Sequence, residues 1–379
     1  MQCDYFNQNK CRSCGWLDRE YTDQLTAKDT ALHSLLDVHQ PQEWLMPVSS
    51  PQTGFRNKAK MAVLGTESAP ILGIVNSEGE EVSLWDCPLY PLDMQRLLHR
   101  LQAWVLQAGL SPYQVDKRQG ELKFILLTRS QFNGEYMLRL VLRSEAMLPR
   151  SKQSLPLLRA DYPNISVASV NIQPVHMAIL EGEKEIFLTQ NTRLSERLNG
   201  VPLYIRPKSF FQTNPAVAAE LYKTARNWTA EIEPASLWDL HCGVGAFALH
   251  CATAQMAVTG IEIEQEAIAC AQQSAQEMGL KHVAFMALDS ADFATKQVAA
   301  PDLIIINPPR RGIGQALCAQ LVDVAPQHIL YSSCNAETLA QDLSHLPGYQ
   351  LTRVQIFDMF PHTPHYEVLV MLTKQSAHL

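Results

Sequence analysis

The sequence lacks any apolar run long enough to cross a membrane. Across its 379 residues, no uninterrupted apolar stretch reaches the roughly 18 residues that a spanning helix needs. The amino terminus, Met1–Tyr5, also lacks the basic region followed by an apolar stretch that a secretory signal requires. We therefore expect a cytoplasmic protein with no membrane partner.

An excess of positive charge is also absent. The chain has 31 Lys and Arg against 38 Asp and Glu, which gives a net charge of −7. This balance predicts a small, localised basic surface rather than a broad cationic one, and a local basic patch is enough to bind a nucleic acid. The hydrophobic content of 46% is that of an ordinary globular protein, and the length allows two or three domains.

Cysteine, by contrast, occurs nine times. Without a secretory signal, we expect these thiols to be reduced and to serve as ligands or nucleophiles rather than in disulfides. Four of them precede residue 90, namely Cys3, Cys11, Cys14 and Cys87. Four thiolates suit zinc or an iron–sulfur cluster, and the proline after Cys87 is more typical of a cluster. Four unrelated thiols are the simpler alternative, which the presence of three cysteines within the first 14 residues disfavours.

The hydrophobic pattern divides the chain into three parts. Residues 1–45 hold Cys3, Cys11 and Cys14 and a helix predicted over 17–39, whereas Cys87 comes from the next part. Residues 46–200 show short runs with a period of two, which indicates a mostly antiparallel sheet with one helix near 92–108. In residues 201–379 strands alternate with helical segments, which is typical of a parallel, doubly wound sheet.

Seven strands are expected in the last part. They are predicted over 236–241, 257–262, 282–288, 302–306, 328–333, 350–358 and 366–373. Helical patterns such as Ala267–Met278 and Gly314–Val324 join the first five strands, whereas the last two predict an antiparallel hairpin at the sheet edge. Seven strands with a reversed last strand fit the class I methyltransferase variant of the Rossmann-like fold better than a dehydrogenase. The predicted fold class is therefore α/β, preceded by an antiparallel β domain with a four-cysteine site.

A glycine-rich turn, Gly243–Ala248, follows the first of these strands. Glycines at such a turn let the backbone approach a ligand closely. Glu262 ends the next strand, where a carboxylate can accept hydrogen bonds from both ribose hydroxyls, and Asp289 ends the third, within reach of an adenine edge. NAD and S-adenosylmethionine share an adenosine ribose, so these residues leave both cofactors open.

The corner Asn307–Pro309 ends the fourth strand. It favours methyl transfer over hydride transfer, because it places a polar group beside the reacting carbon. Prolines that merely end a buried strand are the alternative. Enzymes that methylate adenine N6 or glutamine need an aromatic residue after the proline pair, and here that position is Arg310.

The fifth strand ends at Cys334, on the sheet edge where open α/β sheets bind ligands. A thiolate that adds to C6 of uracil makes C5 nucleophilic toward a sulfonium methyl group. A base must then remove the C5 proton, and Glu367 is the candidate, with His365 and Tyr366 to orient it or to bind the nucleobase. A free cysteine is more often a small buried hydrophobe. We give that interpretation to Cys251, Cys270 and Cys318, each of which lies in a helical pattern.

Together these motifs resemble the RNA 5-methyluridine methyltransferases. The resemblance runs from Cys3 to the carboxyl terminus and rests on Ser209–Asn214, the Gly243 turn, Asn307–Gly312, Ser332–Asn335 and His365–Glu367. It implies that Cys334 is the nucleophile, that Glu367 is the base and that S-adenosylmethionine is the methyl donor. The expected cofactor residues are Gln212, His241, Gly243, Glu262, Asp289 and Asn307.

The resemblance also implies a substrate and a cluster. Phe210 and Arg310 are candidates for holding the flipped base, and the four early cysteines are expected to bind a 4Fe-4S cluster with a structural role. His241 stands where Phe or Tyr is usual, and Asn307 stands where Asp is common. The cysteines and Asn307 are similar to the branch that methylates uracil 747 of 23S ribosomal RNA, whereas the tRNA branch normally lacks the cysteines. A loop uracil is the expected target, and no stable protein partner is implied.

Basic residues before residue 210 are the candidate RNA contacts. Arg56, Lys58 and Lys60 alternate with other residues, so they would share one face of a strand. A competing hypothesis is an RNA-binding or redox-sensing protein with a cluster and no catalysis. It explains the early cysteines but leaves Cys334 and Glu367 without a purpose.

Overall fold

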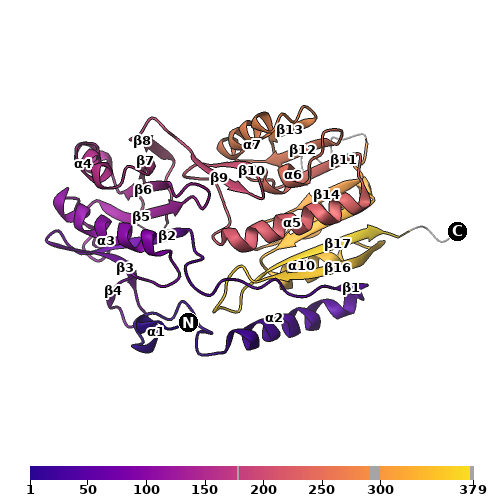
Figure 1. Cartoon of the computed structure of the whole chain (residues 1–379), viewed down its shortest axis with the longest axis horizontal. Coiled ribbons are helices and arrows are strands. Elements are labelled where there is room, and N and C mark those ends of the chain that lie inside the picture. The colour runs from indigo at the N-terminus through magenta and orange to yellow at the C-terminus, as the bar shows by residue number, and fades with distance from the viewer. Residues whose placement is uncertain (177–178, 291–292, 294–298, 376–379) are drawn as a thin grey trace. The chain divides into compact units, whose positions relative to one another are not determined.

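The chain forms two compact units in a computed structural model, which describes all residues except 177–178, 291–292, 294–298 and 376–379 (Figure 1). The first unit contains Met1–Cys14 and Gln52–Glu196, and the second contains Gly15–Pro51 and Arg197–Leu379. This division differs from the expected three parts, because residues 15–51 belong with the carboxyl-terminal unit. The helix α2 (Tyr21–Leu36) buries Leu32 and Leu36 in that unit's core.

The first unit is built on a seven-stranded sheet in the order β4-β3-β2-β5-β6-β7-β8. Its strands are β2 (Lys58–Thr66), β3 (Ala69–Val75), β4 (Glu81–Ser83), β5 (Leu122–Arg129), β6 (Tyr136–Leu142), β7 (Ile165–Ile172) and β8 (Lys184–Phe187). All neighbouring strands pair antiparallel except β6 and β7, which are parallel. A parallel pair needs a crossover, and the helix α4 (Leu148–Asp161) supplies it.

The prediction of one helix in this region was incomplete. The expected helix is α3 (Leu92–Gln107), but α4 was missed because Pro149 and Pro156 interrupt its helical pattern. Pro149 lies in the first turn of α4, where a backbone N–H has no helical partner in any case. Both helices cover the face of the sheet on which β2 buries alternate residues. That core includes Ala59, Met61, Val63, Leu97, Leu101, Trp104, Leu155 and Leu158.

The second unit is built on an eight-stranded sheet in the order β1-β16-β17-β15-β14-β11-β12-β13. Its strands are β1 (Glu43–Trp44), β11 (Ser236–Leu240), β12 (Ala257–Glu262), β13 (Val283–Ala287), β14 (Leu303–Ile306), β15 (His328–Ser333), β16 (Tyr349–Phe357) and β17 (Glu367–Lys374). Strands β11 to β15 pair in parallel, and β17 runs antiparallel to both β15 and β16. The predicted reversed last strand is therefore confirmed.

The predicted antiparallel hairpin of the last two strands is confirmed, but it does not form the outermost edge of the sheet. Strand β17 lies inside the sheet between β15 and β16, and β1 pairs in parallel with the outer side of β16. A strand of two residues has no measurable periodicity, so the sequence pattern did not indicate it. A separate two-stranded ribbon is formed by β9 (Leu194–Leu198) and β10 (Val201–Ile205).

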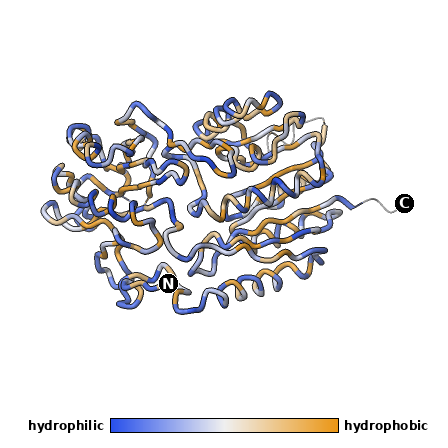
Figure 2. Tube along the Cα trace, in the orientation of Figure 1, coloured by the Kyte–Doolittle hydropathy of each residue, from blue (hydrophilic) through white to orange (hydrophobic). Residues whose placement is uncertain are grey.

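Helices cover both faces of the eight-stranded sheet. Helices α2, α9 (Gly314–Val324) and α10 (Ala336–Ser344) share a core with Trp238 and Leu240 of β11. Asp239 points to the opposite face, where its carboxylate accepts from the backbone of α6 (Ala246–Cys251). Helices α5 (Pro215–Ile232) and α7 (Gln265–Glu277) also belong to this unit, and α5 alternates hydrophobic and hydrophilic residues as expected of a helix with one buried face (Figure 2). Among the described residues, no helix is long and apolar enough to cross a membrane.

Candidate active site

The predicted site residues of the second unit gather where its parallel strands end. The glycine-rich turn follows β11, Glu262 ends β12, Asn307 follows β14 and Cys334 follows β15. Neighbouring parallel strands present their carboxyl ends at the same edge of a sheet, so these segments converge there. Open sheets of this kind bind their ligands at this edge.

The turn after β11 requires glycine. Gly243 and Gly245 have φ angles of +54° and +79°, which side chains rarely allow. A Cβ at Gly245 would also overlap the ring of Phe285, so the backbone here lies closer to that ring than a residue with a side chain would permit. The backbone N–H of Gly243 donates to Oε2 of Glu262 at 3.2 Å, which joins the turn to the end of the next strand.

His241 is surrounded by the charged residues of the predicted cofactor site. Its φ of +64° is also left-handed. Burial lowers the pKa of its imidazole, Glu262 and Asp289 oppose that effect, and Arg311 adds to it. Burial therefore favours the neutral form of the imidazole, which lies near Glu262, Asp289 and Arg311.

The remaining predicted cofactor residues differ in exposure. Gln212 is buried, Asn307 is half-buried and Asp289 is exposed. Glu262 is oriented by three backbone groups, because its Oε1 accepts from the N–H groups of Ile263 and Glu264 at 2.8 and 3.2 Å while its Oε2 accepts from the turn.

Asp239 is a buried acid that the sequence analysis did not single out. It is fully buried, and burial raises the pKa of its carboxyl group to about 8. Its Oδ2 accepts from the N–H of Ala248 at 3.0 Å, whereas its Oδ1 has no hydrogen-bond partner among the described residues. An acidic residue inside an apolar strand, two positions before His241, was the available signal.

Cys334 lies in the turn between β15 and α10 and is half-buried. Ser333 and Asn335 hold this turn, since the Ser333 hydroxyl accepts from Asn335 N and Asn335 Oδ1 accepts from Glu337 N. Burial raises the pKa of the Cys334 thiol, the Glu367 carboxylate raises it further, and the Arg310 guanidinium lowers it. Both charged groups therefore lie near the sulfur.

Glu367 is the first residue of β17 and is 2% exposed. Burial raises the pKa of its carboxyl group from 4.5 to about 7, although the Ser332 hydroxyl donates to Oε1 at 2.6 Å and opposes that rise. Ser333 pairs with Val368 across the two strands, so Glu367 lies opposite the position of Cys334. Ser332 is a second contributor that the sequence analysis missed, because only the strand pairing brings it to Glu367.

Side chains of α10 and of the residue before it bind the backbone of the loop that carries Arg310. Asn335 Nδ2 and Thr338 Oγ1 both donate to the carbonyl of Arg310 at 3.1 Å. Asp342 accepts from the N–H groups of Ile313 and Gly314 at 2.9 and 3.0 Å. The Arg310 side chain stays exposed at the surface. Phe210, the other candidate for holding a base, is 68% exposed.

The four early cysteines of the first unit line one cavity of about 170 Å³, together with Arg56 and Lys60. Burial raises the pKa of Cys14 to about 12 and that of Cys87 to about 11; the neighbouring thiols add to the rise, and the Arg56 guanidinium opposes it. Among the described residues, no three ligand side chains converge as a single-ion site would require. The four thiols therefore border one volume, and both a zinc ion and an iron–sulfur cluster are bound by four thiolates in this way.

The predicted basic face of the first unit is shorter than expected. Strand β2 begins at Lys58, so Arg56 precedes it, and its Nε donates to the Lys58 carbonyl at 3.2 Å. Lys58 and Lys60 alternate with the buried residues of β2, and Lys60 is exposed. Burial lowers the pKa of Lys58 to about 8, and Lys60 adds to that effect.

Comparisons with known proteins agree on one family. The family model described as tRNA (Uracil-5-)-methyltransferase matches residues 181–375. A curated relative from Shewanella loihica, named 23S rRNA (uracil(747)-C(5))-methyltransferase RlmC, is 62% identical over 99% of each chain. The protein of the same name from Shewanella oneidensis is also 62% identical over 99% of each chain.

A solved structure is similar over most of the chain. It is the Pyrococcus abyssi tRNA (uracil-54, C5)-methyltransferase in complex with S-adenosyl-L-homocysteine, with a TM-score of 0.80 and 26% sequence identity. The match covers 95% of this chain and 85% of that one. This chain therefore belongs to the uracil-5-methyltransferase family, whose members methylate C5 of a uracil in RNA.

Proposed function

We propose that this chain transfers a methyl group from S-adenosylmethionine to C5 of uracil 747 in 23S ribosomal RNA. The observation that carries the chemistry is the pairing of β15 with β17, which brings a buried carboxyl group, Glu367, opposite Cys334. The names of the curated relatives support the choice of RNA and of uracil. We expect the chain to act in the cytoplasm, on ribosomal RNA.

Cys334 is the proposed nucleophile. Once the thiol has lost its proton, Sγ forms a bond to C6 of the uracil, and the C5–C6 π electrons move to form an enolate. C5 then forms a bond to the methyl carbon, and the sulfonium–methyl bond breaks to release S-adenosylhomocysteine. Arg310 favours the reactive thiolate, because its guanidinium lowers the pKa of the thiol.

Glu367 is the proposed base. It takes the C5 proton from the covalent adduct, the electron pair re-forms the C5–C6 double bond, and the bond between C6 and Sγ breaks. A carboxyl group with a pKa of about 7 can accept a proton near neutral pH and hold it more firmly than an exposed one. Its burial also keeps water from competing for the proton.

The methyl donor would bind along the strand ends. Glu262 would accept hydrogen bonds from the ribose hydroxyls, Asp289 would face the adenine, and the turn at Gly243 would let the backbone approach the donor. Gln212, His241 and Asn307 complete the proposed donor site. The support for His241 is its position near these charged groups, that for Asn307 is its place at the end of β14, and Gln212 is proposed on the family resemblance and its burial.

Phe210 and Arg310 are proposed to hold the target base, which must be extruded or unpaired to reach the thiol. Both side chains are exposed and available to a ligand. Lys60 and Arg56 are proposed RNA contacts of the first unit. Each would add to the salt dependence of RNA binding. For a chain of net charge −7, the slope of log affinity against log salt should correspond to contacts with only a few phosphates.

We also propose that Cys3, Cys11, Cys14 and Cys87 bind a 4Fe-4S cluster, which would tie the amino terminus to the sheet of the first unit. Four thiols around one cavity support it, and the positive charge of Arg56 would favour their thiolate forms. Iron and sulfide analysis of anaerobically prepared protein is the test. About four irons per chain are expected in the wild type and a strong loss in Cys87→Ser, whereas one zinc per chain would contradict the proposal.

The decisive experiment for the whole function is mass mapping of methylated nucleotides in RNA from cells with and without the chain. Methylation should disappear from uracil 747 of 23S ribosomal RNA and return with the wild-type gene but not with Cys334→Ala. Loss of methylation from a tRNA instead would favour the substrate named for the Pyrococcus protein. Glu367→Gln should accumulate a covalent protein–RNA adduct, since the C5 proton then has no base to accept it.

A further inference from the structure

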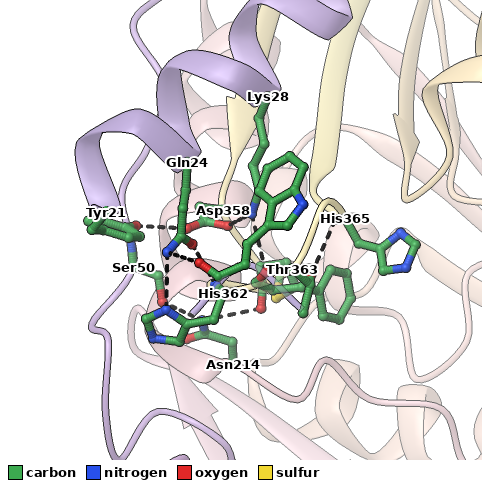
Figure 3. Close-up of polar contacts among 12 residues, drawn as sticks. Tyr21, Gln24, Lys28, Ser50, Asn214, Asp358, His362, Thr363 and His365 are labelled. Atoms are coloured by element: carbon green, nitrogen blue, oxygen red, sulfur yellow. Dashed lines mark hydrogen bonds and ion pairs between the residues drawn. The ribbon is translucent and has the colours of Figure 1, made fainter. Parts of the chain in front are cut away.

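A buried cation lies outside the residues that the proposed reaction uses. The Lys28 ammonium and the Asp358 carboxylate are both fully buried, and Lys28 Nζ donates to Asp358 Oδ1 at 2.5 Å (Figure 3). Lys28 also donates to the carbonyl of Phe360 at 3.2 Å. Buried ion pairs contribute little net stability compared with apolar residues of the same size. The pair therefore points to a role other than stability.

The ion pair holds the segment that leads directly to the proposed base. Asp358 follows the last residue of β16, and Glu367 begins β17, with Phe357 opposite Glu367 in the hairpin register. Segment 358–366 is therefore the connection whose far end is the base. The segment and the strand pairing together hold the first residue of β17 in place.

A neutral side chain of the same helix binds the middle of this segment. Gln24 Oε1 accepts from the N–H of His362 at 2.8 Å, and Gln24 Nε2 donates to the carbonyl of Trp16 at 3.0 Å. The N–H of Trp16 in turn donates to the carbonyl of His362 at 2.9 Å. His362 has a φ of +65°, which non-glycine residues rarely adopt. Both of its backbone polar groups are thus tied to the segment around α2.

The same network reaches the segment Ser209–Asn214, which carries Phe210 and Gln212. Tyr21 donates to Asp358 Oδ2 at 2.7 Å and accepts from the N–H of Ser50 at 2.7 Å. Asn214 Nδ2 donates to Ser50 Oγ at 2.8 Å and to the carbonyl of Met359 at 3.4 Å. These contacts come from α2, from residue 50 and from the start of α5, and they meet on the segment before Glu367 (Figure 3).

We propose that Lys28 and Gln24 are positioning residues, which hold segment 358–366 so that the Glu367 carboxyl group faces C5 of the uracil adduct. The inference rests on the proposed role of Glu367. Lys28 and Gln24 do not touch the reacting atoms; they act through the backbone of the segment. A displacement of about 1 Å in a reacting group can cost about a hundredfold in rate. The loss should fall on proton removal, which is the step that uses Glu367.

The test is the double variant Lys28→Met/Asp358→Asn, which removes both charges and so leaves no buried charge unpaired. The amide oxygen that replaces the carboxylate can still accept from Tyr21. The rate of C5-hydrogen release from RNA with 5-tritiated uracil should fall about 10- to 100-fold. The KM for RNA and the affinity for S-adenosylmethionine should stay within about threefold, and the covalent adduct should accumulate. If Lys28 and Asp358 only stabilised the fold, the loss would not be confined to kcat while KM stayed nearly unchanged.

Arg353→Met is the matched control. Arg353 lies in β16 of the same sheet and forms ion pairs with Glu43 and Glu231 at 3.3 and 2.6 Å, away from the segment. It should release C5 hydrogen at the wild-type rate. Gln24→Met is the second variant, because it removes the bonds to His362 and Trp16 without changing any charge, and it should show the same split even if the double variant does not fold.

The outcomes separate this inference from the function on which it rests. If Glu367→Gln traps no adduct, the proposed base is wrong. If Glu367→Gln traps the adduct while a folded double variant, or Gln24→Met, releases hydrogen at the wild-type rate, the base is right and the positioning role is overturned.

Discussion

Replacing Glu367 by Gln should stabilise the protein at alkaline pH while it stops turnover. The carboxyl group is 2% exposed, and burial raises its pKa from 4.5 to about 7. The folded state therefore binds more protons than the unfolded state between these values, so the free energy of unfolding falls as the pH rises through them. Glutamine carries no charge at any pH, and its amide oxygen can still accept from Ser332.

The size of the gain follows from the two pKa values. At about 1.4 kcal/mol per pKa unit, the rise from 4.5 to about 7 corresponds to about 3 kcal/mol when the carboxyl group is fully ionised. Linkage then predicts a gain for Glu367→Gln of about 1 kcal/mol at pH 5, about 2 kcal/mol at pH 6 and about 3 kcal/mol at pH 8. The charge is unfavourable in the folded state, and the gain measures that cost.

Urea unfolding of both proteins between pH 5 and pH 8.5 measures this gain. Glu220→Gln is the control, because this carboxylate is exposed on α5 and its contact with Lys223 is a surface ion pair, so its effect should stay within about 0.5 kcal/mol at every pH. A gain that does not grow with pH, or a variant less stable than the wild type at pH 8, would refute the reasoning, since the carboxyl group would then not be held with a raised pKa.

Three further predictions concern the second unit. Cys334→Ala should abolish methylation and leave the affinity for S-adenosylmethionine unchanged by calorimetry, because the thiol acts on the nucleobase rather than on the donor. Arg310→Met should move the alkylation of Cys334 by iodoacetamide to higher pH, because the guanidinium lowers the pKa of the thiol. Glu367→Gln should move it to lower pH, because the carboxylate raises that pKa. Mass spectrometry of the alkylated peptide measures both shifts. Gly260→Ala should lower the free energy of unfolding by about 1–3 kcal/mol in urea, because its Cβ would overlap the ring of Phe285.

Each of these has a clear contrary result. Methylation by Cys334→Ala would remove the covalent mechanism. Alkylation profiles that move in the same direction for both charge variants would show that the two side chains do not act on the thiol through their charges. A Gly260→Ala protein as stable as the wild type would mean that the Phe285 ring can move aside without cost.

Much of the candidate site could be predicted because its residues lie at the ends of locally recognisable strands. Strands 257–262 and 328–333 and the helix Gly314–Val324 have the bounds that their hydrophobic patterns predicted. A strand that ends in small or polar residues marks a sheet edge without knowledge of its partners, so Cys334 and the glycine turn could be assigned to the ligand-binding edge. Helix α4 was missed because its prolines hide a pattern that tertiary packing stabilises.

The sequence by itself determined which segments form strands and helices and which chemical groups stand at their ends, because periodicity and turn residues act over a few positions. Only the tertiary structure decided that β17 lies between β15 and β16, that residues 15–51 join the catalytic unit, and that Lys28 lies buried against Asp358. These features depend on pairing between residues far apart in the chain, and Lys28 and Asp358 are 330 positions apart. Such pairing is chosen by the burial of whole faces and the satisfaction of buried polar groups, and neither leaves a local pattern in the chain.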